Sequence, residues 1–270
     1  MTIFEALAAV NAWGVDRQEA QQILLHALAK SPTERAWLLA HDAEVLPPSI
    51  ESQFLALALR RKAGEPMAYL TGQIEFFGML LKVDNRVLVP RPDTETLVEW
   101  AIECTPLNGR LIDLGTGSGA VALAIKHTRA DVKVSAVDFS ADALAVAKAN
   151  AQRLKIDVTF NQSSWLEHAA GHFDVIVSNP PYIALNDSHL AALTHEPQQA
   201  LVSGADGLDD IRAIIQQTPA HLAPGGWLML EHGYNQAERV RHLLTLAGFS
   251  AVQSRRDLSG IERCSGGQQP

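Results

Sequence analysis

Residues 1–70 contain recurring start and stop signals of helices, and they lack the alternation of apolar and polar residues that is typical of strands. Thr2 and Glu5 have the spacing of a capping box, in which each side chain bonds the backbone N–H of the other, and Gly14 is suited to ending that helix. The segment 31–34 repeats the start signal with a proline at the first helical position, and the proline pair 47–48 opens a further helix. We therefore expect a small helical domain over residues 1–70, which either recognises a partner or is a structural accessory.

The period of the pattern changes between residues 71 and 88. Apolar residues dominate the segments 73–78 and 80–83, which predicts two short strands that turn near Gly78. This β-hairpin would link the helical domain to the remainder of the chain, residues 89–270.

A stiff polar segment, Val-Pro-Arg-Pro-Asp-Thr-Glu at 89–95, precedes an apolar helix. One interpretation is a linker that caps this helix at Asp93 or Thr94. The other is that Arg91 and Glu95 line the mouth of a ligand site.

From Leu111 onward, apolar strands alternate with amphipathic helices. The predicted strands are 111–114, 132–137, 158–161, 175–178, 226–231 and 251–254, and the predicted helices are 118–126, 142–154, 209–217 and 237–246. Such βα alternation builds a mostly parallel, doubly wound sheet with helices on both faces. Residues 89–270 are therefore expected to form one α/β domain.

Composition narrows the class of protein. The 47% apolar and 19% charged residues are typical of a globular chain, and the net charge of −8 argues against a protein that coats nucleic acid. Cys104 and Cys264 cannot make a disulfide framework and lack metal-ligand spacing, so we expect a reducing cytoplasm and no metal site. Glu5 interrupts the first apolar stretch and no run approaches ~18 apolar residues, so we expect neither export nor a membrane span.

A glycine-rich turn, Asp-Leu-Gly-Thr-Gly-Ser-Gly at 113–119, joins the first strand of the α/β domain to its first helix. Glycines permit a tight turn and let a ligand approach bare backbone at a helix N-terminus. Asp138 closes the next strand, about 20 residues on, where an acid grips ribose hydroxyls. The pair predicts an adenosine-containing cofactor, either a dinucleotide or S-adenosylmethionine, unless Asp138 only caps a helix.

The apolar strand 175–178 runs directly into Asn179-Pro180-Pro181-Tyr182. The prolines end the strand and hold an extended backbone whose carbonyls no helix can absorb. An amide, a free carbonyl and a flat ring are thus presented at the carboxyl end of a strand, where α/β sheets bind ligands.

The glycine turn, Asp138 and Asn-Pro-Pro-Tyr together resemble class I S-adenosylmethionine-dependent methyltransferases that act on amide or exocyclic amino nitrogens. Further segments make the chain similar to the PrmC/HemK family, the release factor glutamine methyltransferases. These segments are 69–72, 76–78, 89–95, 196–197 and 257–263, and the likeness runs in consistent order from about Tyr69 to Arg263.

The resemblance implies S-adenosylmethionine as the cofactor and a class I methyltransferase fold. The residues that it assigns to the cofactor are Asp113, Gly115, Thr116, Gly117, Ser118, Gly119, Asp138, Trp165 and Asn179. Asp138 would bind the ribose and Trp165 would pack on the adenine, unless Trp165 is a core residue. Ser163 and Ser164 stand where the family commonly has an acid, so a hydroxyl or a backbone carbonyl would accept from the adenine amino group.

The resemblance assigns the substrate glutamine to Asn179, Pro180, Pro181 and Tyr182. The Asn179 side-chain oxygen and the Pro180 carbonyl would accept from the substrate NH₂, and Tyr182 would stack on its plane. No general base is expected. The remaining candidates are Glu196 and Arg263, expected either in a buried ion pair that braces the site or in contact with substrate, and His172, His195 and His232, expected to be surface or capping residues.

The implied partners are peptide chain release factors, met in the cytoplasm by a monomer that binds neither nucleic acid nor membrane. Alternatives are an adenine-N6 nucleic-acid methyltransferase, a ribosomal-protein glutamine methyltransferase, a dinucleotide-dependent oxidoreductase and a non-catalytic binding module. Gly266-Gly267-Gln268 matches the motif that the family methylates, and we interpret this match as coincidence.

Overall fold

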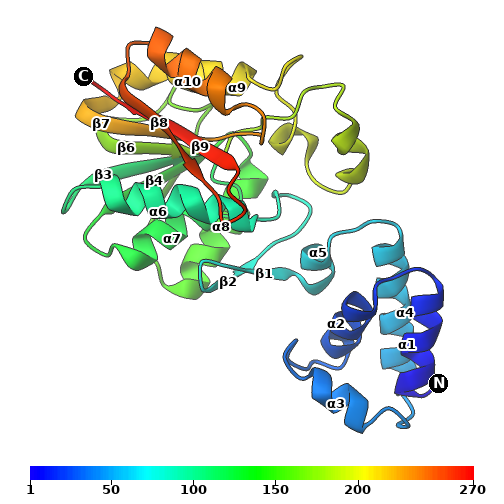
Figure 1. The fold of residues 1–270 in the computed structure, drawn as a ribbon. Coiled ribbons are helices and arrows are strands. Elements are labelled where there is room, and N and C mark those ends of the chain that lie inside the picture. Colours follow the sequence, from blue (N-terminus) through cyan, green and yellow to red (C-terminus); the bar gives the residue numbers. More distant parts are fainter. The chain divides into compact units, whose positions relative to one another are not determined.

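The computed structural model describes residues 1–270, which divide into two compact units, Met1–Gln73 and Ile74–Pro270. The first unit is helical (Figure 1). Its helices are α1 (Ile3–Ala12), α2 (Arg17–Ala27), α3 (Arg35–Ala40), α4 (Pro48–Lys62) and α5 (Met67–Thr71). They share a buried core around Phe54, Ile23 and Leu24. None of the helices in the chain combines the length and the apolar character that crossing a membrane requires.

Helix starts in the first unit test the capping predictions. The capping box of α1 is confirmed, because Thr2 N donates to Glu5 Oε2 at 2.8 Å and Glu5 N to Thr2 Oγ1 at 3.2 Å. The helix start predicted at 31–34 is wrong. Glu34 Oε2 accepts from Ser31 N at 2.8 Å, as in a capping box, but the Ser31 hydroxyl bonds the Thr33 hydroxyl at 2.7 Å and Thr33 N at 3.3 Å in place of Glu34 N. This segment therefore forms a turn, and α3 begins at Arg35.

The predicted hairpin is confirmed as strands β1 (Gln73–Phe76) and β2 (Met79–Lys82). Phe77 and Gly78 between them both have positive φ, at 50° and 71°, which closes the two-residue turn. A 3₁₀ turn η1 (Pro92–Thr94) then leads into α6 (Glu95–Cys104).

A seven-stranded sheet organises the second unit and confirms the doubly wound prediction. Its strands are β3 (Arg110–Leu114), β4 (Lys133–Asp138), β5 (Thr159–Gln162), β6 (Phe173–Ser178), β7 (Leu222–Glu231), β8 (Ser250–Arg256) and β9 (Glu262–Gln268). Their order is β5-β4-β3-β6-β7-β9-β8, and β9 is antiparallel to both of its neighbours.

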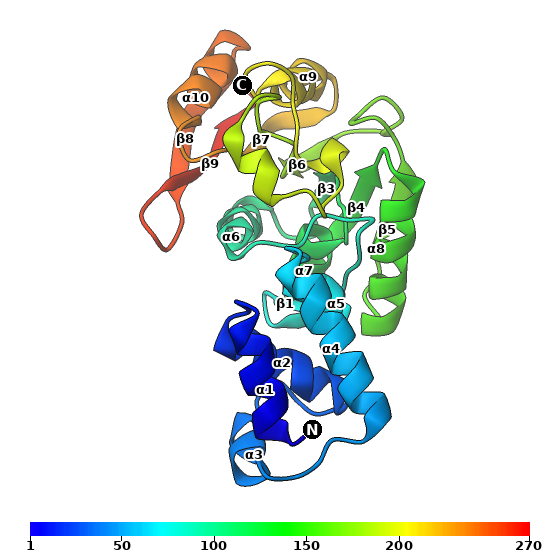
Figure 2. The ribbon, with the colours of Figure 1, turned by 90° about the vertical axis from the view of Figure 1, so that its right-hand side faces the viewer.

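Helices cover both faces of this sheet (Figure 1). One face carries α6, α7 (Ala120–Thr128) and α8 (Ala141–Leu154), and the other carries α9 (Asp209–Gln217) and α10 (Ala237–Leu246). In Figure 2, α8 lies beside β4 and β5, while α10 lies beside β8 and β9 at the other end of the sheet. The short turns η2 (Ser188–Ala192), η3 (Gln198–Ala200) and η4 (Thr218–Ala220) interrupt the connections around α9.

Strand β9 was not among the predicted strands. It lies between β7 and β8 and contains Gly266 and Gly267. A Cβ on Gly266 would lie 2.5 Å from the Leu228 carbonyl oxygen and 2.8 Å from the Trp100 ring, and one on Gly267 would lie 2.8 Å from Phe249 Cβ. Close packing on both faces therefore explains the two glycines without reference to any substrate motif.

The order of the central strands creates the position for a site. The chain leaves β3 for β4 and β5, then returns to place β6 on the opposite side of β3. Connections after β3 and β6 therefore diverge, which opens a crevice at the carboxyl ends of these two strands. The glycine turn 115–119 follows β3, and the segment 179–182 follows β6.

Candidate active site

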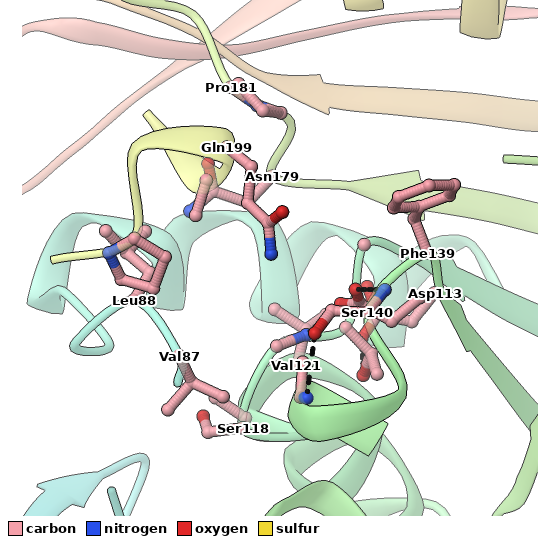
Figure 3. Close-up of a pocket in the computed structure, with 18 of the residues that line it drawn as sticks. Val87, Leu88, Asp113, Ser118, Val121, Phe139, Ser140, Asn179, Pro181 and Gln199 are labelled. Atoms are coloured by element: carbon pink, nitrogen blue, oxygen red, sulfur yellow. Dashed lines mark hydrogen bonds between the residues drawn. The ribbon is translucent and has the colours of Figure 1, made fainter. Parts of the chain in front are cut away.

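A cavity of about 280 Å³ lies at this edge of the sheet (Figure 3). Both of the polar motifs found in the sequence contribute to its wall. The predicted site residues that line it are Asp113, Gly115, Thr116, Gly117, Ser118, Asp138, Trp165, Asn179 and Pro181. Gly119, also predicted, does not line the cavity, and its left-handed backbone helps to form the turn.

The glycine turn depends on left-handed backbone at three positions. Gly115, Gly117 and Gly119 have φ of 69°, 54° and 85°, a region that side chains rarely occupy. Helix α7, predicted from Ser118, begins only at Ala120 because Gly119 is not helical. A Cβ on Gly115 would lie 3.2 Å from Trp165, whereas one on Gly117 would meet nothing within 4 Å. The turn thus gives a ligand open access to backbone at Gly117.

Two carboxyl groups face this turn. Asp113 is 1% exposed and accepts from the Thr116 hydroxyl at 2.7 Å, and burial raises its pKa to about 7. Asp138 accepts from Gly117 N at 2.8 Å and from Ser140 N at 2.9 Å, while burial raises its pKa. Ser140 is the N-cap of α8, so Asp138 is free of the capping role that the sequence left open.

Aromatic rings flank the far part of the cavity. Trp165 is half-buried, packs on core residues and also lines the cavity, so it is partly a core residue, and its contact with adenine stays a prediction. Ser163 and Ser164 line the cavity beside it, and the Ser163 hydroxyl accepts from His168 N at 3.1 Å. Phe139, 71% exposed, also lines the cavity and was missed, although an exposed aromatic directly after Asp138 was a usable signal.

The side-chain amide of Asn179 points into the cavity in Figure 3. Its Nδ2 donates to the Thr94 hydroxyl at 3.2 Å. Its Oδ1 is buried and has no hydrogen-bond partner. Because a buried amide oxygen without a partner costs about 1–3 kcal/mol, this acceptor is suited to a ligand N–H.

A second cavity, of about 130 Å³, lies on the other side of Asn179. Leu88, Asn179 and Ala200 line both cavities, so Asn179 lies at their boundary. The other lining residues of the smaller cavity are Arg91, Tyr182, Ile183, Leu193 and Leu201. Pro180 is buried and lines neither cavity.

Ion pairs fix the segments around the smaller cavity. Arg91 pairs with the buried Glu196, which also accepts from Val89 N at 3.0 Å. Glu95 lines neither cavity and accepts from Phe77 N at 2.9 Å, so of the two residues expected at a ligand mouth only Arg91 is there.

Arg263 pairs with Asp93 at 3.0 Å and with Asp257 at 3.3 Å. Arg263 and the buried Glu196 therefore belong to separate ion pairs, each of which braces a different segment.

Two buried polar residues lie at the end of β7 and directly after it, one of them not anticipated and the other expected elsewhere. Glu231 is 1% exposed, accepts from the Tyr182 hydroxyl at 3.3 Å and has a pKa raised to about 7 by burial. His232, expected at the surface, is buried and bonds the Ser265 hydroxyl at 2.8 Å, and burial lowers its pKa to about 4. The expectation failed because nothing in the local sequence marks the strand end as covered by β9.

Comparison with known proteins assigns the chain to a family. Residues 93–247 match the family model "Methyltransferase small domain", and residues 5–72 match "PrmC N-terminal domain". A release factor glutamine methyltransferase of Bordetella pertussis is 49% identical over 262 residues, covering 94% of this chain and 95% of that protein.

Solved structures share the fold. A methyltransferase from Pyrococcus furiosus matches with a TM-score of 0.57 at 20% identity, covering 81% of this chain and 98% of that one. The T. thermophilus 16S rRNA N2 G1207 methyltransferase (RsmC), solved with AdoMet and guanosine, matches with a TM-score of 0.53 at 18% identity, covering 73% and 50%. With its methyltransferase fold, its N-terminal domain and its near full-length relatives, the chain belongs to the family of release factor glutamine methyltransferases.

Proposed function

We propose that this protein transfers a methyl group from S-adenosylmethionine to the side-chain amide nitrogen of the glutamine in the Gly-Gly-Gln motif of peptide chain release factors. The buried, unpartnered Oδ1 of Asn179 at the boundary of two cavities carries the proposal, because it offers an acceptor to an amide NH₂. The name of the relative from Bordetella pertussis supports the choice of substrate.

The larger cavity fits the methyl donor. Open space at Gly117 leaves room beside bare backbone, and the Asp113 and Asp138 carboxyls lie at the wall, where a bound cation would favour their ionised forms. Asp138 ends β4 at the cavity wall, where its oxygens would bind the ribose, and Trp165 and Phe139 offer ring faces for the adenine. S-adenosylmethionine supplies, when bound, an electrophilic methyl group on a positively charged sulfur.

The smaller cavity fits the acceptor. Ile183, Leu193 and Leu201 supply an apolar wall for the methylene groups of a glutamine side chain, and Tyr182 supplies a ring. Asn179 lies where this cavity meets the larger one. A glutamine amide that entered here would reach the methyl donor at Asn179.

The site residues would act by orienting the amide group of the substrate glutamine. An amide nitrogen is a poor nucleophile because its lone pair is delocalised into the carbonyl, so the site must hold it in line with the methyl group. Asn179 Oδ1 would accept from an N–H group of the substrate amide and stabilise the positive charge that develops on nitrogen. The Pro180 carbonyl, expected as a second acceptor, belongs to a buried residue that lines neither cavity. The new N–C bond replaces the S–C bond, and one proton passes from nitrogen to water, so no side chain need act as a base.

Labelling with radioactive S-adenosylmethionine tests the proposal. We expect label on a release factor and none on its variant with the motif glutamine changed to asparagine. Equal label on both proteins, or label on a DNA or RNA oligonucleotide in place of the release factor, would overturn it.

The variant Asn179→Ala tests the role of the amide. We expect kcat to fall by about a hundredfold or more, because an acceptor for the reacting nitrogen is lost, while the Kd for S-adenosylmethionine changes by less than about threefold. Kinetics and isothermal titration calorimetry measure the two effects. Asn161→Ala, an exposed asparagine on β5, is the matched control. Equal losses of turnover and of cofactor affinity in N179A would contradict this role.

A further inference from the structure

A single cation lies in the wall of the smaller cavity. Arg91 is the only charged residue among those that line this space, and its side chain is 39% exposed. Apart from Asn179 and Tyr182, the other lining residues are apolar. An ionised group beside apolar side chains is costly to leave without partners. The partners of this guanidinium therefore determine what the cavity can bind.

Glu196 holds the guanidinium in place. Its side chain is 2% exposed and lines neither cavity. One oxygen of its carboxylate accepts from Arg91 Nη2, and the other accepts from Val89 N at 3.0 Å. The carboxylate thus fixes one side of the guanidinium and is itself fixed by backbone. It is a support for Arg91 and is not available to a ligand.

The other donors of Arg91 remain for a ligand. A guanidinium carries N–H groups on each of its nitrogens and has no acceptor. The structure pairs only Nη2 with a protein acceptor, so Nε and Nη1 have none. Because the side chain is partly exposed, water bonds these groups until a ligand oxygen replaces it.

Pairing with Glu196 also selects the charge of that ligand. The guanidinium and the carboxylate together have no net charge. A phosphate would be attracted by Arg91 and repelled by Glu196, so it would gain little from the pair. A carbonyl oxygen can accept from the free N–H groups without bringing a charge of its own. The cavity therefore favours neutral carbonyl acceptors over phosphates.

The side-chain carbonyl of the substrate glutamine is an unsuitable partner for Arg91. A charge-assisted hydrogen bond at that oxygen would draw the nitrogen lone pair further into the carbonyl and weaken the nucleophile. The backbone carbonyls beside the glutamine carry no such penalty. The glutamine side chain is short, so these carbonyls would lie close to the cavity that holds its amide. Those of glycine residues are the most accessible, because no side chain covers them.

We propose that Arg91 is a substrate-binding residue, which donates hydrogen bonds to a backbone carbonyl of the two glycines before the target glutamine, and that Glu196 is the positioning residue that directs it. This inference rests on the proposed function, since it concerns the acceptor of the same reaction. It makes the peptide backbone, in addition to the glutamine side chain, part of what the site binds.

The variant Arg91→Met tests the contact, because methionine keeps an apolar stem and removes the donors. We expect KM for a release factor to rise by about tenfold or more, since charged hydrogen bonds to the substrate are lost. The kcat at saturation and the Kd for S-adenosylmethionine should each change by less than about threefold, because the reacting nitrogen is still held. Lys133→Met removes an exposed charge at the start of β4, the opposite end of that strand from Asp138, and is the matched control.

Ester bonds in a short Gly-Gly-Gln peptide separate a direct contact from a change of cavity shape. An ester bond after either glycine makes the carbonyl of that glycine a weaker acceptor. The inhibition constant against labelling of a release factor measures how tightly each peptide binds. We expect one of the two ester peptides to bind the wild-type chain about threefold or more less tightly than the all-amide peptide, and R91M to bind the two equally.

Glu196→Gln tests the positioning role. The amide oxygen can still accept from Val89 N, but the charge of Arg91 is no longer neutralised. We expect KM for the release factor to rise, and inorganic phosphate to inhibit E196Q at concentrations about tenfold lower than those that inhibit the wild type. Equal inhibition of the two proteins by phosphate would refute the role of Glu196.

The remaining outcomes distinguish the inference from the proposed function. An unchanged KM in R91M, or ester effects that are the same in R91M and the wild type, would overturn the inference while the wild-type chain still labels the release factor. No label from the wild-type chain would reject the proposed function and the inference together.

Discussion

At the scale of single residues, two buried carboxyls make contributions to stability that depend on pH. Asp113 and Glu231 are each about 1% exposed, and burial raises the pKa of both to about 7. In the unfolded chain these groups ionise near pH 4. Between about pH 4 and pH 7 these two carboxyls therefore bind more protons in the folded state than in the unfolded state, and their contribution to stability falls as pH rises through this window. His232, whose pKa burial lowers to about 4, contributes with the opposite sign below about pH 6.5.

The variant Asp113→Asn tests the sign of this effect. Each such carboxyl contributes a slope of at most about 1.4 kcal/mol per pH unit, and the amide removes one of them. We expect the unfolding free energy of the cofactor-free wild type to fall, relative to D113N, between pH 5 and pH 7. Urea unfolding at four pH values between 5 and 8 measures it. Parallel curves for the two proteins would show that Asp113 is ionised in the folded state.

At the scale of elements, β9 holds the far half of the sheet together. It pairs with β7 on one side and β8 on the other, and it brings Arg263 to Asp93 and Ser265 to His232. Strand β8 therefore joins the sheet only through β9. Changes to β9 should affect stability before they affect the cavity.

Gly266→Ala should destabilise the second unit. Its Cβ would lie 2.5 Å from the Leu228 carbonyl oxygen and 2.8 Å from Trp100, and neither backbone nor a buried ring can move away cheaply. We expect a loss of about 3 kcal/mol of unfolding free energy, seen in chemical denaturation. Gln268→Ala, which loses only the bond from Nε2 to Gly225 O, should cost less than about 1 kcal/mol. Similar losses in both variants would refute the packing argument.

Elements with a strong local pattern could be predicted from the sequence. Helices α9 and α10 have the predicted bounds, because apolar positions at helical spacing and flanking polar residues define them locally. Strand β9 could not be predicted, since Cys264-Ser265-Gly266-Gly267 lacks β-branched residues and its pairing depends on distant strands.

The sequence likewise predicts some residues of the candidate site and not others. The glycine turn and the segment 179–182 could be located because each is a motif next to a strand. Glu231 could not, since a single acid after an apolar strand has no distinctive spacing. Its burial arises only when β9 and the residues around Thr94 and Tyr182 cover it.

At the scale of the whole molecule, both cavities belong to one of the two compact units. All residues that line the two cavities lie between Arg86 and Asp210, within the second unit. The first unit has its own core and contributes no residue to either cavity. We therefore propose that residues 1–70 recognise the protein substrate, joined by the hairpin 71–88 to a catalytic domain of residues 89–270.

A variant that begins at Gly72 tests this division. We expect the Kd for S-adenosylmethionine to change by less than about threefold, because the cavity is intact, and kcat/KM on an intact release factor to fall by about tenfold or more through loss of contact area. A short peptide with Gly-Gly-Gln should be methylated equally by both chains. A similar loss on the peptide would show that the first unit supports catalysis itself.

The place of Gly266-Gly267-Gln268 in β9 bears on how a substrate is chosen. Its backbone is paired within the sheet, and the Gln268 amide nitrogen donates to Gly225 O at 2.7 Å. The same three residues would be a target in an exposed loop, yet here they cannot enter any pocket while the protein is folded. An enzyme that carries its own target sequence in this form must distinguish an accessible loop from a paired strand. The three residues of the motif are then insufficient by themselves, because the glutamine must also be free of backbone pairing to reach the site.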